Sequence, residues 1–562
     1  MATNGIYKVA DLCEAATDGN VEQIQNILTA QPDLINLHMA ENNEHRAIHY
    51  AVMNQHTDAV RVLMEAGAIH TSGIYPHRDA TAAVTMAQER GYDDIVTIIH
   101  EEDEKRKLAA CKNITISEEN DALFEAVQKK NDKEALKILD QNPDLLDACH
   151  RNGGSVIYAA ASKGRYQLVQ ELLTRGADIT HLTPEGQSPL DGAVHNVRGR
   201  NRPLNEGCLI CAGILLQAGC KLSLESAIAL NEPDFVKQYA KNHPDRFQSN
   251  DSDRDGLLQI AVQNDNIDML RLLLDLGLHP DDRHQLHNYE SKPFSWGQPL
   301  GGAAGNSQYD IAELLLEHGA DPNASMYASG NSIAAAYNNQ DEKMKGLLFR
   351  YGATLDHTTA GLNGETSAAA VALQNDPALA KDLLWAAGCG GDINIVGMCL
   401  KQLDWKPDNS RWFSLLEQPL RLWRANPHRK FRDFDRSVYP EIFRMILDHG
   451  ASPNLVGRYG YRIAHSLAAC GVVWGEPIMT EIERVTFAEI LCDYNADLNV
   501  IDELLQSTPL GWAVRWGKIE LAHLYLERGA DPTLAGDEWA TPLAWAEKKD
   551  HTDIADLIKR YL

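Results

Sequence analysis

The sequence lacks any apolar run of the roughly 18 residues that a helix needs to cross a bilayer. Its first eight residues also lack the basic and apolar regions of a signal peptide. Basic charge is scarce, because 52 Lys and Arg stand against 79 Asp and Glu, for a formal net charge of -27. Nucleic-acid binding needs a basic face that neutralises phosphates. We therefore expect a cytoplasmic protein that binds neither nucleic acid nor a membrane.

Motifs for disulfides, metals and catalysis are also missing. The ten cysteines are scattered, which argues against a disulfide framework. Cys208 and Cys211 form a lone C-x-x-C without the second ligand pair that zinc requires. The run 251–256 begins like a calcium-binding loop, but Val262 stands where the bidentate Glu belongs. No G-x-S-x-G or H-E-x-x-H occurs. We therefore assign no catalytic residue, cofactor or metal ligand.

A repeated pattern runs through nearly the whole chain. Residues 508–517 read T-P-L-G-W-A-V-R-W-G, and E-R-G-A-D-P follows at 527–532. Less regular copies of this pattern occur along the chain. Each predicts a first helix rich in small residues, followed by a second helix that carries apolar residues at i, i+3 and i+4. Several second helices end in glycine, which adopts positive φ without a Cβ clash. These glycines are Gly67, Gly176, Gly219, Gly277, Gly319, Gly352, Gly450 and Gly529.

This pattern resembles the ankyrin repeat, whose mark is T-P-L-H-x-A followed by an apolar run and Gly-Ala-Asp. The resemblance implies an all-α solenoid of roughly fifteen helix-turn-helix units, and a surface that recognises proteins. Some fifteen units would form an arc on the order of 150 Å in contour length. We expect N-terminal ankyrin repeats at 1–100, a charged linker or irregular helix at 101–119, and the main stack at 120–562.

Three units depart from the pattern through long inserts between their helices, near 196–208, 423–438 and 472–484. Inserts in repeat proteins emerge on one face and often supply binding. The second insert is rich in arginine, whose planar fork matches carboxylates and phosphates. The alternative is that these arginines pair with the protein's own acidic residues, such as Asp433 and Asp435. Our candidate partner-binding residues from the inserts are Trp423, Arg424, His428, Arg429, Arg432 and Trp474.

All ten tryptophans occur at or after Trp296. By alignment with ankyrin units, the two residues that follow the small residues of the first helix face the concave groove. This alignment places Arg515 and Trp516 in the groove, and both residue types are favoured interface anchors. Lys548 and Lys549 occupy the same positions of the next unit. The alternative for Trp385, Trp512 and Trp545 is that they fill gaps between repeats.

Two functions remain open. The first is a non-catalytic scaffold that binds a partner protein, or an acidic or phosphorylated peptide, in its groove. The second is an enzyme whose small-molecule site lies beneath the inserts of the C-terminal half, with His428 or Asp433 taking part. Ankyrin repeats serve mostly as recognition surfaces, so we expect the first.

Overall fold

The computed structural model is mainly α-helical. It describes all residues except 1–6, 39–43, 75–76, 111–116, 151–152, 184–185, 195–205, 248–252, 255, 287–293, 297, 325–330, 426–434 and 474–475. The described part of the chain contains 33 α-helices and five short strands. This confirms the predicted helical class.

The helices follow one another in short antiparallel pairs. The first group comprises α1 (Val9–Thr17), α2 (Val21–Ala30), α3 (Ala47–Met53), α4 (Thr57–Glu65), α5 (Arg78–Thr81), α6 (Ala83–Arg90) and α7 (Asp93–Ala110). The second comprises α8 (Glu118–Gln128), α9 (Asp132–Gln141), α10 (Val156–Ser162), α11 (Tyr166–Thr174), α12 (Pro189–Val194), α13 (Glu206–Gln217), α14 (Leu224–Ala229), α15 (Pro233–Asn242), α16 (Leu257–Gln263), α17 (Ile267–Asp275), α18 (Pro299–Gly305), α19 (Tyr309–Glu317), α20 (Ser332–Asn338) and α21 (Glu342–Arg350). The third comprises α22 (His357–Asn363), α23 (Thr366–Asn375), α24 (Ala380–Gly390), α25 (Ile393–Leu400), α26 (Arg411–Glu417), α27 (Val438–Asp448), α28 (Ile463–Ala469), α29 (Glu481–Asp493), α30 (Pro509–Arg515), α31 (Ile519–Glu527), α32 (Pro542–Lys548) and α33 (Thr552–Lys559).

Short 3₁₀ helices and strands lie in the connections. The 3₁₀ helices are η1 (Pro32–Asn36), η2 (Pro143–Leu145), η3 (Pro244–Arg246), η4 (Pro377–Leu379), η5 (Pro419–Arg421), η6 (Trp423–Ala425), η7 (Arg458–Gly460) and η8 (Glu538–Ala540). The strands are β1 (Asp253–Arg254), β2 (Arg283–Leu286), β3 (Phe294–Trp296), β4 (Val472–Val473) and β5 (Glu476–Pro477). β1 pairs parallel with β2, β2 pairs antiparallel with β3, and β4 pairs antiparallel with β5.

Local sequence explains how each pair begins and ends. Thr508 caps α30 by accepting a hydrogen bond from the backbone N–H of Gly511 at 3.3 Å, and Pro509 occupies the first turn, where its missing N–H does no harm. Gly529 follows α31 with φ of 89°, a conformation in which a Cβ would be strained. All eight glycines that the sequence marked as helix ends have positive φ. The predicted helix boundaries are confirmed at these positions.

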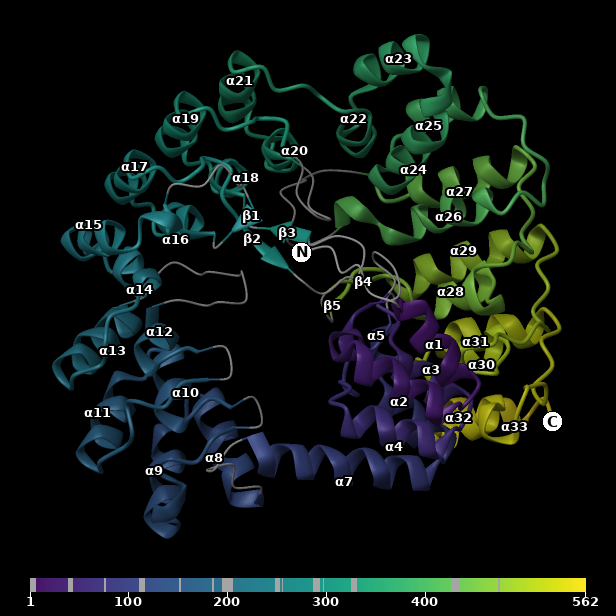
Figure 1. Ribbon diagram of the computed structural model, residues 1–562. Helices are drawn as coiled ribbons and strands as arrows, with labels where there is room; N and C mark the ends of the chain where they lie inside the picture. The colour runs from purple at the N-terminus through teal and green to yellow at the C-terminus, as the bar shows by residue number, and fades with distance from the viewer. Residues whose placement is uncertain are drawn as a thin grey trace.

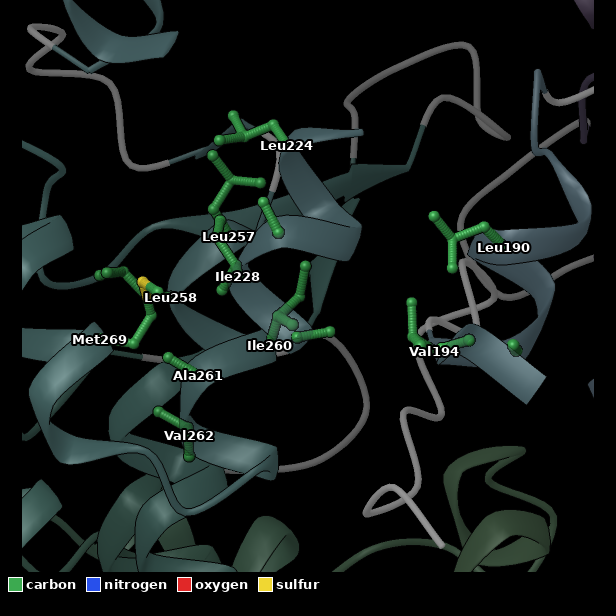
Figure 2. Close-up of a cluster of buried hydrophobic side chains, with 14 of the residues drawn as sticks. Leu190, Val194, Leu224, Ile228, Leu257, Leu258, Ile260, Ala261, Val262 and Met269 are labelled. Atoms are coloured by element: carbon green, nitrogen blue, oxygen red, sulfur yellow. The ribbon is translucent and has the colours of Figure 1, made fainter. Parts of the chain in front are cut away.

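The core is continuous from repeat to repeat. Figure 2 shows a section of it, in which Leu190 of α12, Ile228 of α14 and Leu257 of α16 lie along successive first helices. All three are fully buried or nearly so. The second helices contribute to the same cluster through residues such as Met269 of α17. A single pair could not cover its own apolar face, so the repeats stabilise one another by stacking.

The stack curves until its two ends meet. In Figure 1 the chain passes through α8–α21 along one side and returns through α22–α33 to lie beside α1–α6. On the first side, α10, α12, α16, α18 and α20 lie on the inner edge and α11, α13, α15, α17 and α19 on the outer edge. Contacts between α6 and η8 join the two ends. The region 101–119 begins as a regular helix, because α7 continues unbroken to Ala110. The sequence predicted an arc, but it did not predict that the arc closes.

Candidate interaction site at the ring closure

The strongest contact between the two ends is an ion pair of buried side chains. Arg515, the last residue of α30, donates from Nε and Nη2 to the two carboxylate oxygens of Glu89 in α6, at 3.0 and 2.6 Å. Arg515 is 5% exposed and Glu89 is 7% exposed. Lys549 also donates to the Glu89 carboxylate, at 2.5 Å. One carboxylate therefore receives two cationic side chains in a largely desolvated position, where charge-assisted bonds are strong.

A second carboxylate and a backbone carbonyl extend this contact. The indole N–H of Trp516 donates to Asp79 of α5 at 3.2 Å, and Arg515 approaches the same oxygen at 3.4 Å. Lys548 donates to the backbone carbonyl of Glu89. The Arg515 guanidinium also lies 4.4 Å from the centre of the Trp516 ring, within the range of a cation–π interaction. The closure site is defined here by its main residues, namely Asp79, Glu89 and Arg90 from the N-terminal repeats and Arg515, Trp516, Lys548 and Lys549 from the C-terminal repeats.

The repeat pattern explains why these cations converge. Arg515 and Trp516 end α30, while Lys548 and Lys549 end α32, the equivalent helix of the next unit. Equivalent positions of stacked repeats point in the same direction, so the four side chains share one face. At these positions the four side chains meet the N-terminal repeats.

A buried network fixes α30 in place. Asp502 is 1% exposed and accepts hydrogen bonds from the backbone N–H of Leu504, Leu505 and Ser507. Its carboxylate also accepts the indole N–H of Trp512 at 2.8 Å. Burial raises the pKa of Asp502, and these hydrogen bonds oppose that rise because they favour the charged form.

His77 inserts into aromatic rings of the C-terminal repeats. Its ring centre lies 5.0 Å from that of Trp512, 5.8 Å from Trp516 and 6.1 Å from Tyr461. His77 is 7% exposed, and its Nε2 has no hydrogen-bond partner among the described residues. Burial lowers the pKa of His77 to about 4, so the ring is neutral at pH 7. The neutral ring packs edge to face against Trp512, with 88° between the ring planes.

Arg90 joins the two ends through backbone carbonyls. Its guanidinium donates to the carbonyl of Met53 at 3.2 Å and to that of Leu504 at 2.5 Å. The group also lies 5.4 Å from the ring centre of Trp539. Burial lowers the pKa of Arg90. Arg90 thus connects α6 of the N-terminal repeats to the loop around Leu504 in the C-terminal repeats.

A histidine and a tyrosine form a separate contact point. The Tyr459 hydroxyl lies 2.7 Å from Nδ1 of His45, and the two rings stack with 5.3 Å between centres and 9° between planes. Tyr459 has φ of 56°, in the left-handed region, and its carbonyl accepts the N–H of Glu503 at 2.7 Å. Burial lowers the pKa of His45 to about 3.

Two apolar residues of the N-terminal repeats reach the hydrophobic cluster of the C-terminal repeats. Ala80 of α5 is fully buried within the hydrophobic cluster of the C-terminal repeats, and Met53 packs against the same cluster. Other apolar residues of the N-terminal repeats belong to a cluster of their own that spans Val9 to Ile99. The ends of the ring therefore meet mainly through charged, polar and aromatic groups.

The predicted binding residues divide into two sets. Arg515 and Trp516 come together in the closure site. Arg424 is half-buried, with its backbone N–H 3.1 Å from the Tyr439 hydroxyl. The remaining candidates lie outside the described residues or have undescribed side chains, and they are Trp423, His428, Arg429, Arg432 and Trp474.

One arginine of the second insert follows the alternative interpretation. Arg436 forms an ion pair with Glu483 at 2.5 Å and donates to the carbonyl of Ile478 at 2.7 Å. Hydrogen bonding to Glu483 raises the pKa of Arg436. At this position the insert is paired with an acid of the protein itself, although with Glu483 and not with Asp433 or Asp435.

Of the three tryptophans with a gap-filling alternative, two are fully buried and Trp385 is partly buried. Trp512 and Trp545 are fully buried between repeats, as the gap-filling alternative predicted. Cys208 and Cys211 are both buried in α13. Burial raises the pKa of Cys211 to about 12, which makes its thiol unreactive at neutral pH.

The described ranges contain no candidate metal site and no candidate membrane-spanning helix. Within them, no three His, Cys, Asp or Glu side chains lie close enough together to hold a metal ion. No helix there combines the length and the apolar composition that crossing a membrane requires.

Comparison with known proteins supports the repeat interpretation. A family model for ankyrin repeats in three copies matches residues 224–326. The chain is similar to the palmitoyltransferases ZDHHC13 of Pongo abelii and Homo sapiens, each 27% identical over 137 residues, or 20% of this chain. These matches span 22% of the length of either relative. An ankyrin repeat and KH domain-containing protein of Caenorhabditis briggsae is 22% identical over 375 residues, which cover 61% of this chain and 13% of that protein. The chain thus contains ankyrin repeats, at residues 224–326.

Proposed function

We propose that the protein is a non-catalytic interaction scaffold whose C-terminal repeats recognise acidic segments of a partner protein. Ankyrin repeats generally mediate contacts between proteins. The observation that carries the proposal is that the groove residues Arg515, Trp516 and Lys549 already bind carboxylates, those of Asp79 and Glu89.

The chemistry of the groove fits carboxylates better than apolar ligands. Arg515 offers a two-point donor fork, Lys549 adds a mobile ammonium, and Trp516 supplies both an apolar face and an N–H donor. Such cation–aromatic pairs are the residue types that dominate the binding energy of protein interfaces. The arginine-rich insert, with Arg429 and Arg432, would extend the basic surface along the same half of the chain. We also propose a cytoplasmic site of action.

A pair of labelled peptides tests the proposal directly. The probe is a ten-residue peptide of alternating Glu and Ala, and its control has Gln in place of Glu. We expect the full chain to bind the acidic peptide in a salt-dependent manner and to bind the Gln peptide at least about tenfold more weakly, since charged pairs supply the affinity.

Matched lysine variants locate the site. Lys548→Ala with Lys549→Ala should weaken binding of the acidic peptide about tenfold, because both ammonium groups lie in the groove. Lys559→Ala removes an exposed lysine from the neighbouring helix α33 and should leave the affinity unchanged. Equal binding of the Glu and Gln peptides would refute the proposed recognition of carboxylates.

A further inference from the structure

We infer that the ring closure is a self-inhibiting contact, in which Glu89 of the N-terminal repeats occupies the C-terminal groove until an acidic segment of a partner protein displaces it. This inference rests on the proposed function, because it concerns the same groove. It adds a regulatory role for the N-terminal repeats, which neither the ankyrin pattern nor the relatives assign.

The first argument is that one carboxylate of the N-terminal repeats accepts hydrogen bonds from two cations of the C-terminal repeats. The Glu89 carboxylate accepts two hydrogen bonds from Arg515 and one from Lys549, and its own backbone carbonyl accepts a fourth from Lys548. Asp79 makes longer contacts, at 3.2 and 3.4 Å. An incoming Glu or Asp side chain offers the same acceptors as Glu89. It can therefore replace Glu89 without any new geometry in the groove.

The second argument is that each side stays folded when the contact opens. The N-terminal repeats have their own hydrophobic cluster, from Val9 to Ile99, and the C-terminal repeats have another. Of the N-terminal residues, Ala80 and Met53 are the ones placed against the C-terminal cluster within the described ranges. Opening the ring thus exposes Ala80, Met53 and the aromatic faces that contact His77, while the rest of each hydrophobic cluster stays intact. Polar contacts of this kind between parts of one chain resemble transient interfaces.

The third argument concerns the tether. Both ends belong to one chain and the curved stack of repeats between them brings them together, so the contact forms within one molecule. A modest attraction is then enough to keep the groove occupied. A partner that binds only the open ring has its apparent affinity reduced by the open fraction. The closed ring therefore raises the partner concentration that is needed to occupy the groove.

Scattering from the full chain tests whether the contact opens. Glu89→Lys places a cation against Arg515 and Lys549 and should raise the radius of gyration above that of the wild type. Glu65→Lys is the matched control, because Glu65 is an exposed residue of α4 and the charge change is the same. Adding Arg515→Glu to Glu89→Lys should restore the compact form. Equal radii for the wild type and Glu89→Lys would overturn the inference.

Peptide binding then separates this inference from the proposed function. We expect Glu89→Lys to bind the Glu–Ala peptide about tenfold more tightly than the wild type or Glu65→Lys, because the competing carboxylate is gone. Equal affinities in all three proteins would refute self-inhibition and leave the recognition of carboxylates standing. An expanded Glu89→Lys ring that binds the Glu and Gln peptides equally would refute the proposed function instead.

Discussion

Glu89 and Arg515 lie 426 positions apart in the sequence and form a two-point ion pair, with N–O distances of 2.6 and 3.0 Å. Their meeting converts a curved stack of repeats into a ring (Figure 1). Each repeat contacts its neighbours, so the approach of the two ends depends on curvature summed over the whole stack. A small change of angle at one repeat would separate the ends, and the closure site opposes that change.

The buried Asp502 should be important for stability. Replacing Asp502 with Ala leaves three backbone N–H groups and the indole N–H of Trp512 without their acceptor. Unpaired buried donors are destabilising, and we expect a loss of roughly 3 kcal/mol in the free energy of unfolding. Urea denaturation followed by tryptophan fluorescence measures this loss. Asp556→Ala, an exposed change in α33, should have almost no effect.

The ring should open as the pH falls below about 6.5. Burial lowers the pKa of His77 from 6.5 to about 4, with Asp79 opposing the shift and Arg515 adding to it. When the site is open and His77 is exposed, the ring takes up a proton near pH 6.5, whereas the closed site excludes the proton down to about pH 4. The free energy of ring closure therefore becomes less favourable as the pH falls from 6.5 to 4, by about 3 kcal/mol in total.

A fluorescence transfer pair placed on the two ends would follow this opening. His77→Phe keeps a flat ring among the aromatic residues but cannot titrate, so it should flatten the pH profile in this range. Some pH dependence of ring opening should persist in His77→Phe, because burial also lowers the pKa of His45, to about 3. An unaltered profile in His77→Phe would assign the opening to other groups.

The repeat architecture was predictable because its determinants are local. Capping by Thr508, the glycine turns and the apolar spacing each act within one unit. The positions of Arg515 and Trp516 at the end of a first helix followed from the same local register. Their occupants, Asp79 and Glu89, could not be predicted, because no short-range pattern links residues more than 400 positions apart.

The contributions of His77 and Arg90 were also missed. His77 looks like an ordinary loop residue in the sequence, and its role arises from three aromatic rings contributed by distant repeats. Arg90 binds backbone carbonyls, which every sequence offers, so residue type gives no hint of its partners. Correlated changes in related sequences are the one source that could have identified such pairs.

Cutting the chain between the two sub-stacks should not separate them at low salt. A protease site inserted at 111–116 divides the chain after α7, and the charged linker predicted at 101–119 makes this the natural place to cut. The fragments should then stay together through the closure site and elute as one species. In about 0.5 M salt they should still elute mainly together, since a buried ion pair such as Arg515–Glu89 is screened much less than an exposed one.

Gel filtration of the cut protein gives the measurement. Cut Glu89→Lys should separate even at low salt, whereas cut Glu65→Lys should behave as the wild type does. Fragments of the wild type that part at low salt would show that the closure site contributes little attraction.

The arginine-rich insert carries the last prediction. Arg429 and Arg432 concentrate positive charge on a chain of net charge -27, beside the aromatic residues Phe431 and Phe434. If an acidic partner contacts this insert, changing both arginines to Glu should weaken the binding. We expect a loss of about 2–5 kcal/mol if the pair is buried on binding, and a much smaller loss at the rim of the interface.

The melting temperature distinguishes this role from a structural one. Solvent-exposed ion pairs contribute about 0–1 kcal/mol, so Arg429→Glu with Arg432→Glu should leave the melting temperature nearly unchanged. Arg436→Ala is the contrasting variant, because Arg436 pairs with Glu483 and donates to the carbonyl of Ile478. This substitution should therefore reduce the stability modestly. Unchanged binding of the Glu–Ala peptide by the double variant would exclude the insert from the binding site. A collapse of its melting temperature would instead show that these arginines hold the stack together.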